Sequence, residues 1–172
     1  LTIRHRKDNR VLLEDFSMVL NPGDKAAIIG EEGNGKSTLL KLIYDETLVE
    51  DYIDYSGEVI RNNARIAYLA QELTDAERRM SAYEFMCEMP SFFDLSPKDM
   101  ASVAAQLQIP HGLFYAEQEL GNFSGGEKIK LQLARILLSQ SDVLFLDEPS
   151  NDLDLTTVRW LEKFIADSKL PV

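Results

Sequence analysis

The sequence predicts a mixed α/β fold in which a mostly parallel core sheet carries an inserted helical segment. Three observations support this fold class. Residues 25–30 are apolar and strand-like, and a glycine-rich loop and a helix follow them directly. A second buried strand is predicted at 143–146, after a long amphipathic helix at 124–138. Between these units, residues 73–122 show helical patterns, which place a helical segment inside a sheet-based fold.

The first quarter of the chain holds the β-rich part of the predicted fold, including an antiparallel portion. Residues 11–20 have the pattern of a half-buried strand and residues 25–30 that of a fully buried one. The Pro-Gly step at 21–24 predicts a turn between them. Leucines and isoleucine at helical spacing then predict a helix at 35–44.

The next segment is strongly acidic. Residues 45–58 contain six acidic side chains and no basic one, which predicts a solvated loop. Two short strands are expected after it, at 57–60 and 64–70, with a turn at 61–63 between them.

Helices dominate the rest of the chain. Ser96 can cap a helix whose first position Pro97 can occupy. A final helix is predicted at 155–168, and its apolar stripe includes the single tryptophan, Trp160. Such a stripe indicates core packing rather than ligand binding.

Composition limits the function classes. The 172 residues are 45% hydrophobic and 27% charged, as in an ordinary globular protein. The net charge of −11 argues against a broad surface that grips nucleic-acid phosphates. No apolar run approaches the roughly 18 residues of a membrane-spanning helix, and the basic N-terminus is not followed by the apolar segment of a secretory signal. The single cysteine, Cys87, excludes an internal disulfide, fits a reducing compartment and is expected to be a buried hydrophobe.

Residues 30–37, GEEGNGKS, match the pattern G-x-x-x-x-G-K-[ST] between a predicted strand and a predicted helix. Glycines let successive backbone N–H groups point at one centre, and the helix dipole adds a positive field there. Lys36 is expected across the β- and γ-phosphates of a polyphosphate, and the Ser37 hydroxyl on Mg²⁺. The predicted phosphate-binding residues are Gly30, Gly33, Asn34, Gly35, Lys36, Ser37 and Thr38.

Two acidic residues follow the predicted strand at 143–146. Asp147 and Glu148 come off its carboxyl end, the edge at which open α/β sheets bind ligands. Neighbouring strand residues point in opposite directions, so the two acids can have different roles. We expect Asp147 to bind Mg²⁺ and Glu148 to orient or deprotonate an attacking water.

A second glycine-rich helix start lies at 122–128. Ser124, Gly125 and Gly126 offer a hydroxyl and free N–H groups to an anion. This start has no lysine in the position of Lys36, so it is not predicted to hold a second nucleotide in the same way. A capped helix start without ligand is the structural alternative.

Four elements therefore follow in order: GEEGNGKS at 30–37, AYLAQE at 67–72, FSGGEK at 123–128 and VLFLDEP at 143–149. Together they resemble the ATPase domain of the ABC superfamily, a P-loop NTPase, over essentially the whole chain. In that family they are the Walker A loop, the Q-loop, the signature and Walker B.

The resemblance implies roles and partners. Such domains pair head to tail, so Ser124, Gly125 and Gly126 would close over the γ-phosphate that the partner's Walker A loop holds. Gln71 would sense the γ-phosphate and Mg²⁺ and relay this to the helical subdomain. The implied ligands are ATP and Mg²⁺, and the implied interface loop contains Asp152 or Asp154. One domain is expected over 1–172, with an ATP-binding core at 1–72 and 123–172 and a helical subdomain at about 73–122.

Three departures from the family pattern limit what the resemblance implies. The switch histidine is expected on a strand after 155–168, beyond the last residue here, and neither His5 nor His111 matches it. The fragment alone is therefore expected to be nearly inactive. No Tyr or Phe among the first ten residues can stack on adenine, and His5 is only a weak candidate. Glu32 stands where Asn is common in the family.

The residues around two motifs resemble the ABC-F branch, whose members are soluble two-domain ATPases that act on the ribosome. Glu127 and Lys128 follow the signature glycines, and SNDLD follows Walker B. This resemblance implies a cytoplasmic protein in translation or antibiotic resistance that binds the ribosome and a second ABC ATPase domain, in the same chain or as a homodimer. Two alternatives remain: the ATPase of a membrane transporter, with a membrane subunit as partner, and a clamp that closes on ATP with negligible hydrolysis.

Overall fold

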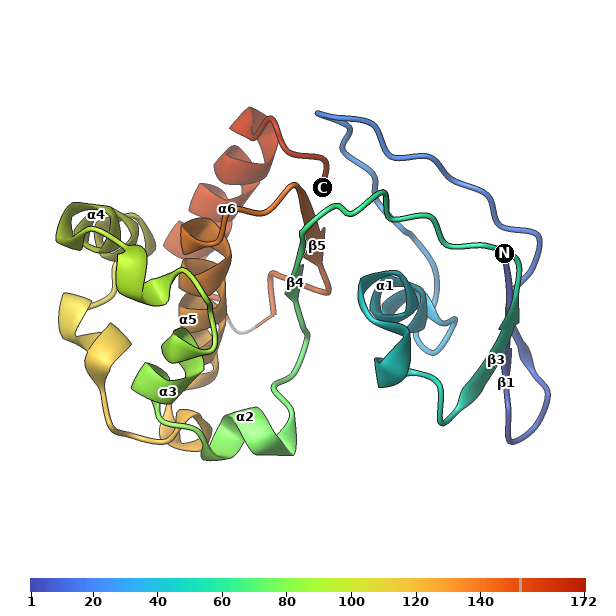
Figure 1. Ribbon diagram of the computed structural model, residues 1–172, viewed down its shortest axis with the longest axis horizontal. Coiled ribbons are helices and arrows are strands. Elements are labelled where there is room, and N and C mark those ends of the chain that lie inside the picture. Colours follow the sequence, from blue (N-terminus) through green and yellow to red (C-terminus); the bar gives the residue numbers. More distant parts are fainter. Residues whose placement is uncertain (152) are drawn as a thin grey trace.

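The computed structural model describes residues 1–151 and 153–172. Within them it contains a three-stranded antiparallel sheet and a two-stranded parallel pair. Figure 1 shows the antiparallel sheet at one side, helix α1 next to it, the parallel pair in the middle and the remaining helices beyond. The predicted mixed α/β fold class is confirmed.

The antiparallel sheet has the order β2-β1-β3. Its strands are β1 (Thr2–His5), β2 (Val11–Leu13) and β3 (Ile53–Ser56). Ile3 of β1 and Ile53 of β3 are buried in one cluster with Leu39 and Leu42 of α1. This cluster fixes α1, the helix that follows the glycine-rich loop, against the sheet, because burying apolar side chains on both elements stabilises their contact.

The parallel pair consists of β4 (Ile66–Leu69) and β5 (Val143–Leu146). Ile66 lies opposite Val143 and Leu69 opposite Leu146, so both strands end at the same edge. The residues that follow the two strands are thereby brought together, although they are far apart in the sequence.

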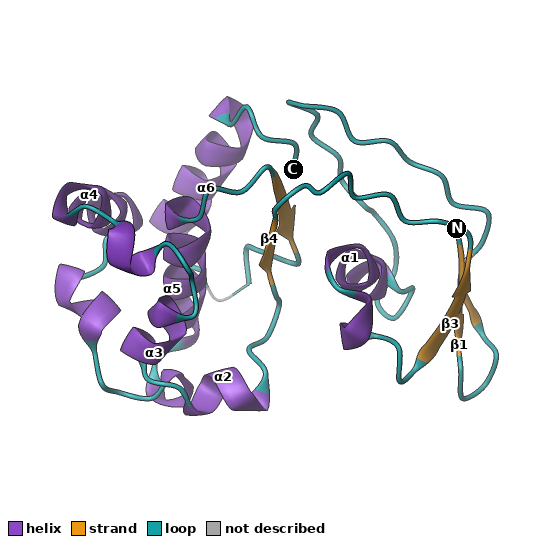
Figure 2. Cartoon of the chain, viewed as in Figure 1, coloured by secondary structure: helices purple, strands orange, loops and turns teal. Residues whose placement is uncertain are grey.

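Most helices lie on one side of the β4-β5 pair and α1 lies on the other (Figure 2). The helices are α1 (Lys36–Tyr44), α2 (Asp75–Arg79), α3 (Ala82–Cys87), α4 (Pro97–Leu107), α5 (Gly125–Leu138) and α6 (Leu155–Asp167). The 3₁₀ turns are η1 (Glu46–Leu48), η2 (Phe92–Asp94), η3 (His111–Tyr115) and η4 (Leu120–Asn122). In the described part of the chain, no helix has the length and apolar character needed to cross a membrane.

The start of α4 is as predicted. The Ser96 hydroxyl accepts a hydrogen bond from the backbone N–H of Asp99, and Pro97 occupies the first turn. The Pro-Gly turn at 21–24 is also confirmed, since Asp24 N–H donates to the Asn21 carbonyl. Cys87, expected to be buried, is only half-buried against the main core.

Residues 25–30 do not form the fully buried strand that the sequence predicts. The segment has no regular secondary structure, and Ile29 is 93% exposed. Backbone atoms of residues 24–26 hydrogen-bond with Val172 rather than with β5, and a cavity of about 470 Å³ lies between the segment and β5. Without a sheet strand directly beside it, the segment has no partner to bury both faces, so this prediction is wrong.

The strand boundaries before β4 also differ from the predicted ones. Only Val11–Leu13 of the strand expected at 11–20 is regular, and residues 57–60 form no strand. The acidic segment at 45–58 contains η1 and β3 instead of a continuous loop. The residue pattern of this segment did not predict β3, because only one residue of that strand is buried and the others face solvent.

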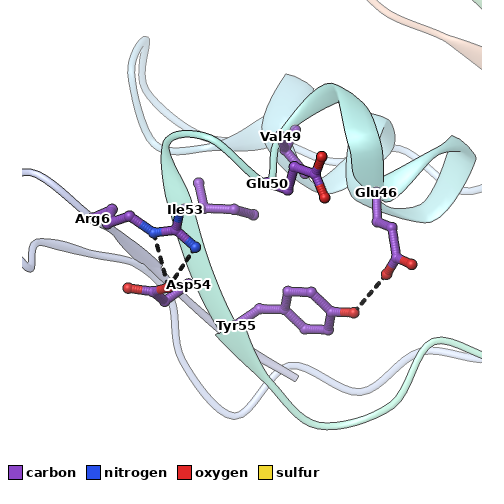
Figure 3. Close-up of a pocket in the computed structure, with 7 residues that line it drawn as sticks. All are labelled: Arg6, Glu46, Val49, Glu50, Ile53, Asp54 and Tyr55. Carbon is purple, nitrogen blue, oxygen red and sulfur yellow. Dashed lines mark hydrogen bonds and ion pairs between the residues drawn. The ribbon is translucent and has the colours of Figure 1, made fainter.

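The acidic segment is tied down by polar contacts that line a small cavity of about 200 Å³ (Figure 3). Arg6 pairs with Asp54 at 2.9 Å, and the Tyr55 hydroxyl donates to Glu46 at 2.8 Å. These contacts join β3 to η1 and to the turn after β1. Two of the acidic side chains, Asp54 and Glu46, therefore stabilise the local structure.

The pair of Arg65 and Asp142 gives a pH-dependent prediction. The Asp142 carboxylate accepts hydrogen bonds from the Arg65 side chain at 3.0 and 3.1 Å and from its backbone N–H at 2.9 Å, which together lower the pKa of Asp142 to about 2. A lowered pKa stabilises the fold above the ordinary value of about 3.9 and loses that effect as pH falls through the folded value. We expect the difference in unfolding free energy between the wild type and Asp142→Asn to shrink from about pH 5 to about pH 2. Urea unfolding across this range measures it, and a constant difference would contradict the assignment.

Candidate functional site

The loop that leads into α1 has the backbone that the glycine pattern predicts. Gly33 and Gly35 have positive φ values of 77° and 78°, a region that other residues rarely adopt. Gly35 is also the N-cap of α1, and a Cβ there would lie 3.0 Å from the Leu12 side chain. Both conformation and close packing against β2 therefore require glycine at this position.

Lys36 lies over its own loop. Its Nζ donates hydrogen bonds to the backbone carbonyls of Gly30 and Glu31, at 2.8 Å each. A positive charge is thus held at the mouth of the loop, at the N-terminus of α1. Asn34 closes the loop by donating its N–H to Glu31 at 3.3 Å, and Thr38 lies in the first turn of the helix.

Asp147 connects this loop to the end of β5. The Ser37 Oγ donates to Asp147 Oδ1 at 2.9 Å, across 110 residues of sequence. Asp147 is only 4% exposed, and its Oδ2 accepts from the Tyr68 hydroxyl at 2.9 Å. Burial, followed by the negative charge of Asp147, raises the pKa of Tyr68, so the phenol stays protonated and can donate.

The oxygens of Ser37 and Asp147 suit a hard cation beside phosphate groups. Mg²⁺ in phosphate-binding sites is held by one or two protein oxygens together with phosphate oxygens and water. The two side chains are in direct contact at the loop mouth, so both can face one cation. The residues present therefore fit Mg²⁺.

Glu148 stands beside Asp147 in a conformation that is unusual for a non-glycine residue. Its φ is 48°, in the left-handed region, which costs of order 1–3 kcal/mol. Its Oε2 accepts from Gln71 Nε2 at 3.3 Å and from Asn151 Nδ2 at 2.9 Å. Two amides from different segments thus hold an exposed carboxylate at the edge where β4 and β5 end.

The second glycine-rich start is a capped helix N-terminus. Ser124 and Glu127 form a capping box at the start of α5, and these bonds from Ser124 lower the pKa of Glu127. Among the described residues, no hydrogen bond joins 124–126 to the loop at 30–38. The structure therefore places the two glycine-rich helix starts at separate points of one chain.

The turn after Glu148 leads into α6. Asp154 caps that helix by accepting from Thr157 N–H at 2.9 Å and from its hydroxyl at 2.7 Å. The other interface candidate, Asp152, lies outside the described residues. His5, the weak candidate for adenine stacking, ends β1, where its Nδ1 lies 3.2 Å from Asp8 Oδ1 and its ring centroid lies 6.4 Å from that of Tyr52.

Three polar contacts were missed by sequence reasoning, those of Tyr68, Asn151 and Lys130. The sequence signal available for the first was a tyrosine inside the otherwise apolar segment at 66–69. Asn151 lies three residues after Glu148, a spacing that permits a turn contact. Lys130 gave no signal, because its partner, Asp154, is distant in the sequence.

Comparison with known proteins gives the family. A family model described as "ABC transporter" matches residues 13–151. The chain belongs to the ABC transporter family. The predicted ABC ATPase domain is thereby confirmed, and the relatives agree with its assignment to the ABC-F branch.

Curated relatives of this ABC domain are much longer proteins. The tylosin resistance ATP-binding protein TlrC of Streptomyces fradiae is 34% identical, over 95% of this chain and 36% of its own length. The probable ATP-binding protein YheS of Escherichia coli (strain K12) is 31% identical, over 95% and 29%. Elongation factor 3 of Pneumocystis carinii is 32% identical, over 91% and 14%. The chain thus spans 36% or less of the length of these relatives.

Solved structures agree on the fold of the domain. A putative ABC transporter ATP-binding protein from Pyrococcus furiosus superposes with a TM-score of 0.67 over 96% of this chain and 84% of that one. The sequence identity is 24%, so the match shows the fold alone.

The contact between Tyr68 and Asp147 can be tested by removing one hydroxyl. We expect Tyr68→Phe to lower the unfolding free energy by about 1–3 kcal/mol, because a hydrogen bond to a buried carboxylate is lost. The control is Tyr44→Phe, whose ring lies 5.2 Å from that of Tyr68 and whose hydroxyl makes no hydrogen bond within the described residues. Equal effects of the two substitutions in urea unfolding would contradict the contact.

Proposed function

We propose that this ABC domain binds and hydrolyses ATP as part of an ABC-F-type protein that associates with the ribosome, in translation or in antibiotic resistance. The observation that carries the ATPase part is the contact between Ser37 and Asp147, which joins a phosphate loop to a strand end with two carboxylates. The proposed ligands are ATP and Mg²⁺.

The loop at 30–38 would bind the phosphates of ATP. Its backbone N–H groups and the N-terminus of α1 offer a fixed positive field. Lys36 would exchange the carbonyl oxygens of Gly30 and Glu31 for phosphate oxygens, keeping its charge hydrogen-bonded throughout. Asn34 and Thr38 would supply further contacts from the loop and the first helical turn.

Asp147 and Glu148, at the edge where β4 and β5 end, would carry the hydrolysis step. Mg²⁺, held by Ser37, Asp147 and Gln71, supplies charge neutralisation at the phosphate oxygens when bound. Glu148 would orient the attacking water and accept its proton. The side-chain amides of Gln71 and Asn151 would orient the Glu148 carboxylate by donating hydrogen bonds to it. This orientation requires no rearrangement of β5.

Two copies of such a domain would complete the site. Ser124, Gly125 and Gly126 would close over the ATP held by a second ABC ATPase domain, in the same longer chain or in a homodimer. We place the ATP-binding core at 1–72 and 123–172 and the helical subdomain at about 73–122. Gln71 lies at the boundary between these parts, where a contact with ATP could move the helices.

The names of relatives support the ribosome over a membrane partner. One relative over 91% of the chain is named an elongation factor, and another over 95% a tylosin resistance protein. Solved neighbours are named as transporter subunits, but their identity to this chain, below 25%, concerns the fold alone. A transporter ATPase with a membrane subunit stays the alternative that the experiment below must exclude.

The full-length protein with Glu148→Gln should co-sediment with ribosomes in ATP more strongly than the wild type. Without a base the ATP-bound form persists, and we expect hydrolysis to slow by about 10² to 10⁴ while ATP binding is retained. Sedimentation with purified ribosomes and phosphate release measure the two effects.

Lys36→Ala is the matched control. Loss of the positive charge of Lys36 from the loop at 30–38 should abolish both ATP binding and the ATP-dependent co-sedimentation. Normal turnover in Glu148→Gln would remove this residue from the proposed role. Exclusion from ribosome fractions together with a co-purifying membrane subunit would favour the transporter instead.

A further inference from the structure

The buried carboxylate of Asp147 is held from two sides by hydroxyl groups of different origin. Ser37 of α1 donates to Oδ1 and Tyr68 of β4 donates to Oδ2, each at 2.9 Å. The backbone N–H of Asp147 also donates to the Leu69 carbonyl at 3.0 Å, which fixes the main chain beside β4. Rotation of the carboxylate about its Cβ–Cγ bond would therefore break at least one hydrogen bond.

The two oxygens of Asp147 face different surroundings. Oδ1 lies beside Ser37, at the mouth of the loop where the phosphates and the cation are proposed to bind. Oδ2 is occupied by the phenol of Tyr68, and phenol oxygens are not among the usual ligands of Mg²⁺ or Ca²⁺. Asp147 thus has one oxygen available to a cation and one that is engaged elsewhere.

The ring of Tyr68 is fixed, so its hydroxyl cannot easily leave Oδ2. The side chain is half-buried, and its ring centroid lies 5.2 Å from that of Tyr44, a separation at which aromatic pairs attract. Tyr68 also lies opposite Phe145 in the register of β4 and β5. If the phenol moved away, Oδ2 would stay buried without its donor, which is costly.

A carboxylate with one engaged oxygen suits some cations better than others. Mg²⁺ needs a near-octahedral shell at about 2.0–2.1 Å, keeps several waters and takes few carboxylate oxygens. Ca²⁺ binds roughly six to eight oxygens at longer distances and accepts both oxygens of one carboxylate. Because Tyr68 occupies Oδ2, Asp147 can serve the first kind of shell but cannot give two oxygens to the second.

We infer that Tyr68 is a positioning residue that makes Asp147 a ligand through one oxygen and thereby sets the preference of the site for Mg²⁺ over Ca²⁺. This inference rests on the proposed function, because it requires that the domain binds ATP together with a divalent cation. Tyr68 contacts neither ATP nor the reacting atoms and acts only through Asp147.

The test measures how much each cation strengthens ATP binding. The dissociation constant of radiolabelled ATP is determined for the full-length protein in saturating Mg²⁺, in saturating Ca²⁺ and in EDTA. The ratio of the value in EDTA to the value in each metal gives the Mg²⁺ ratio and the Ca²⁺ ratio. All proteins carry Glu148→Gln, so that ATP is not consumed. Tyr68→Phe is compared with the parent, with Tyr44→Phe as the matched control and with Asp147→Asn as the variant without the carboxylate.

A role in cation preference predicts a split between the two ratios. In the parent, the Mg²⁺ ratio should exceed the Ca²⁺ ratio. Tyr68→Phe should lower the Mg²⁺ ratio by about tenfold to a hundredfold, as loss of a group that orients a metal ligand does, while the Ca²⁺ ratio stays constant or rises. Tyr44→Phe should match the parent, and Asp147→Asn should lower both ratios. Lower stability of Tyr68→Phe does not disturb the comparison, because a smaller folded fraction raises all three dissociation constants by one factor.

Four results would overturn the inference. If Tyr68→Phe keeps both ratios of a parent whose ATP binding Mg²⁺ strengthens, Tyr68 has no such role. Equal losses of the two ratios show that Tyr68 supports Asp147 without selecting the cation. The same change in Tyr44→Phe shows an effect of ring packing. A parent that does not bind ATP, or whose ATP binding neither cation strengthens, refutes the proposed function and this inference with it.

Discussion

The hydrogen bond between Ser37 and Asp147 is the constraint on which the rest of the site depends. It joins the first turn of α1 to the end of β5, and so fixes the glycine-rich loop at 30–37, which lies on the side of the antiparallel sheet, against the parallel pair. Asp147 is buried, and a buried carboxylate without partners would be strongly destabilising. Ser37 and Tyr68 each donate a hydrogen bond to one of its two oxygens. The need of the buried carboxylate for hydrogen-bond donors thus also aligns the two halves of the site.

Glu148 depends on that alignment. Since Asp147 is anchored, the chain reverses immediately after it, and Glu148 takes a left-handed conformation that places its side chain between Gln71 and Asn151. The strain at Glu148 is offset by contacts with the ends of β4 and of the following turn. The same turn ends at Asp154, which forms an ion pair with Lys130 of α5. Polar contacts thus join Ser37 to Asp147, Glu148 to Asn151, and Asp154 to Lys130 inside α5.

Much of this architecture could be predicted from local pattern. The loop at 30–37, the caps of α4 and α5 and the strand at 143–146 each carry their signal within a few residues. Contacts between distant segments could not be predicted in this way: Tyr68 with Asp147 and Lys130 with Asp154 depend on which elements become neighbours. The same reason explains the wrong strand at 25–30. An apolar pattern shows that a segment can be buried, whereas burial also needs a neighbouring strand, and here residues 171–172 stand between the segment and β5.

The central claim is that one cation site unites Ser37 and Asp147, and iron-directed cleavage tests it most directly. Fe²⁺ in place of Mg²⁺, with ATP, ascorbate and peroxide, cuts the backbone next to the bound metal. The account predicts ATP-dependent cuts both near Ser37 and near Asp147 in the full-length protein, and loss of both cuts in Lys36→Ala. Cleavage at only one of the two segments, or at both without any dependence on ATP, would contradict a shared site.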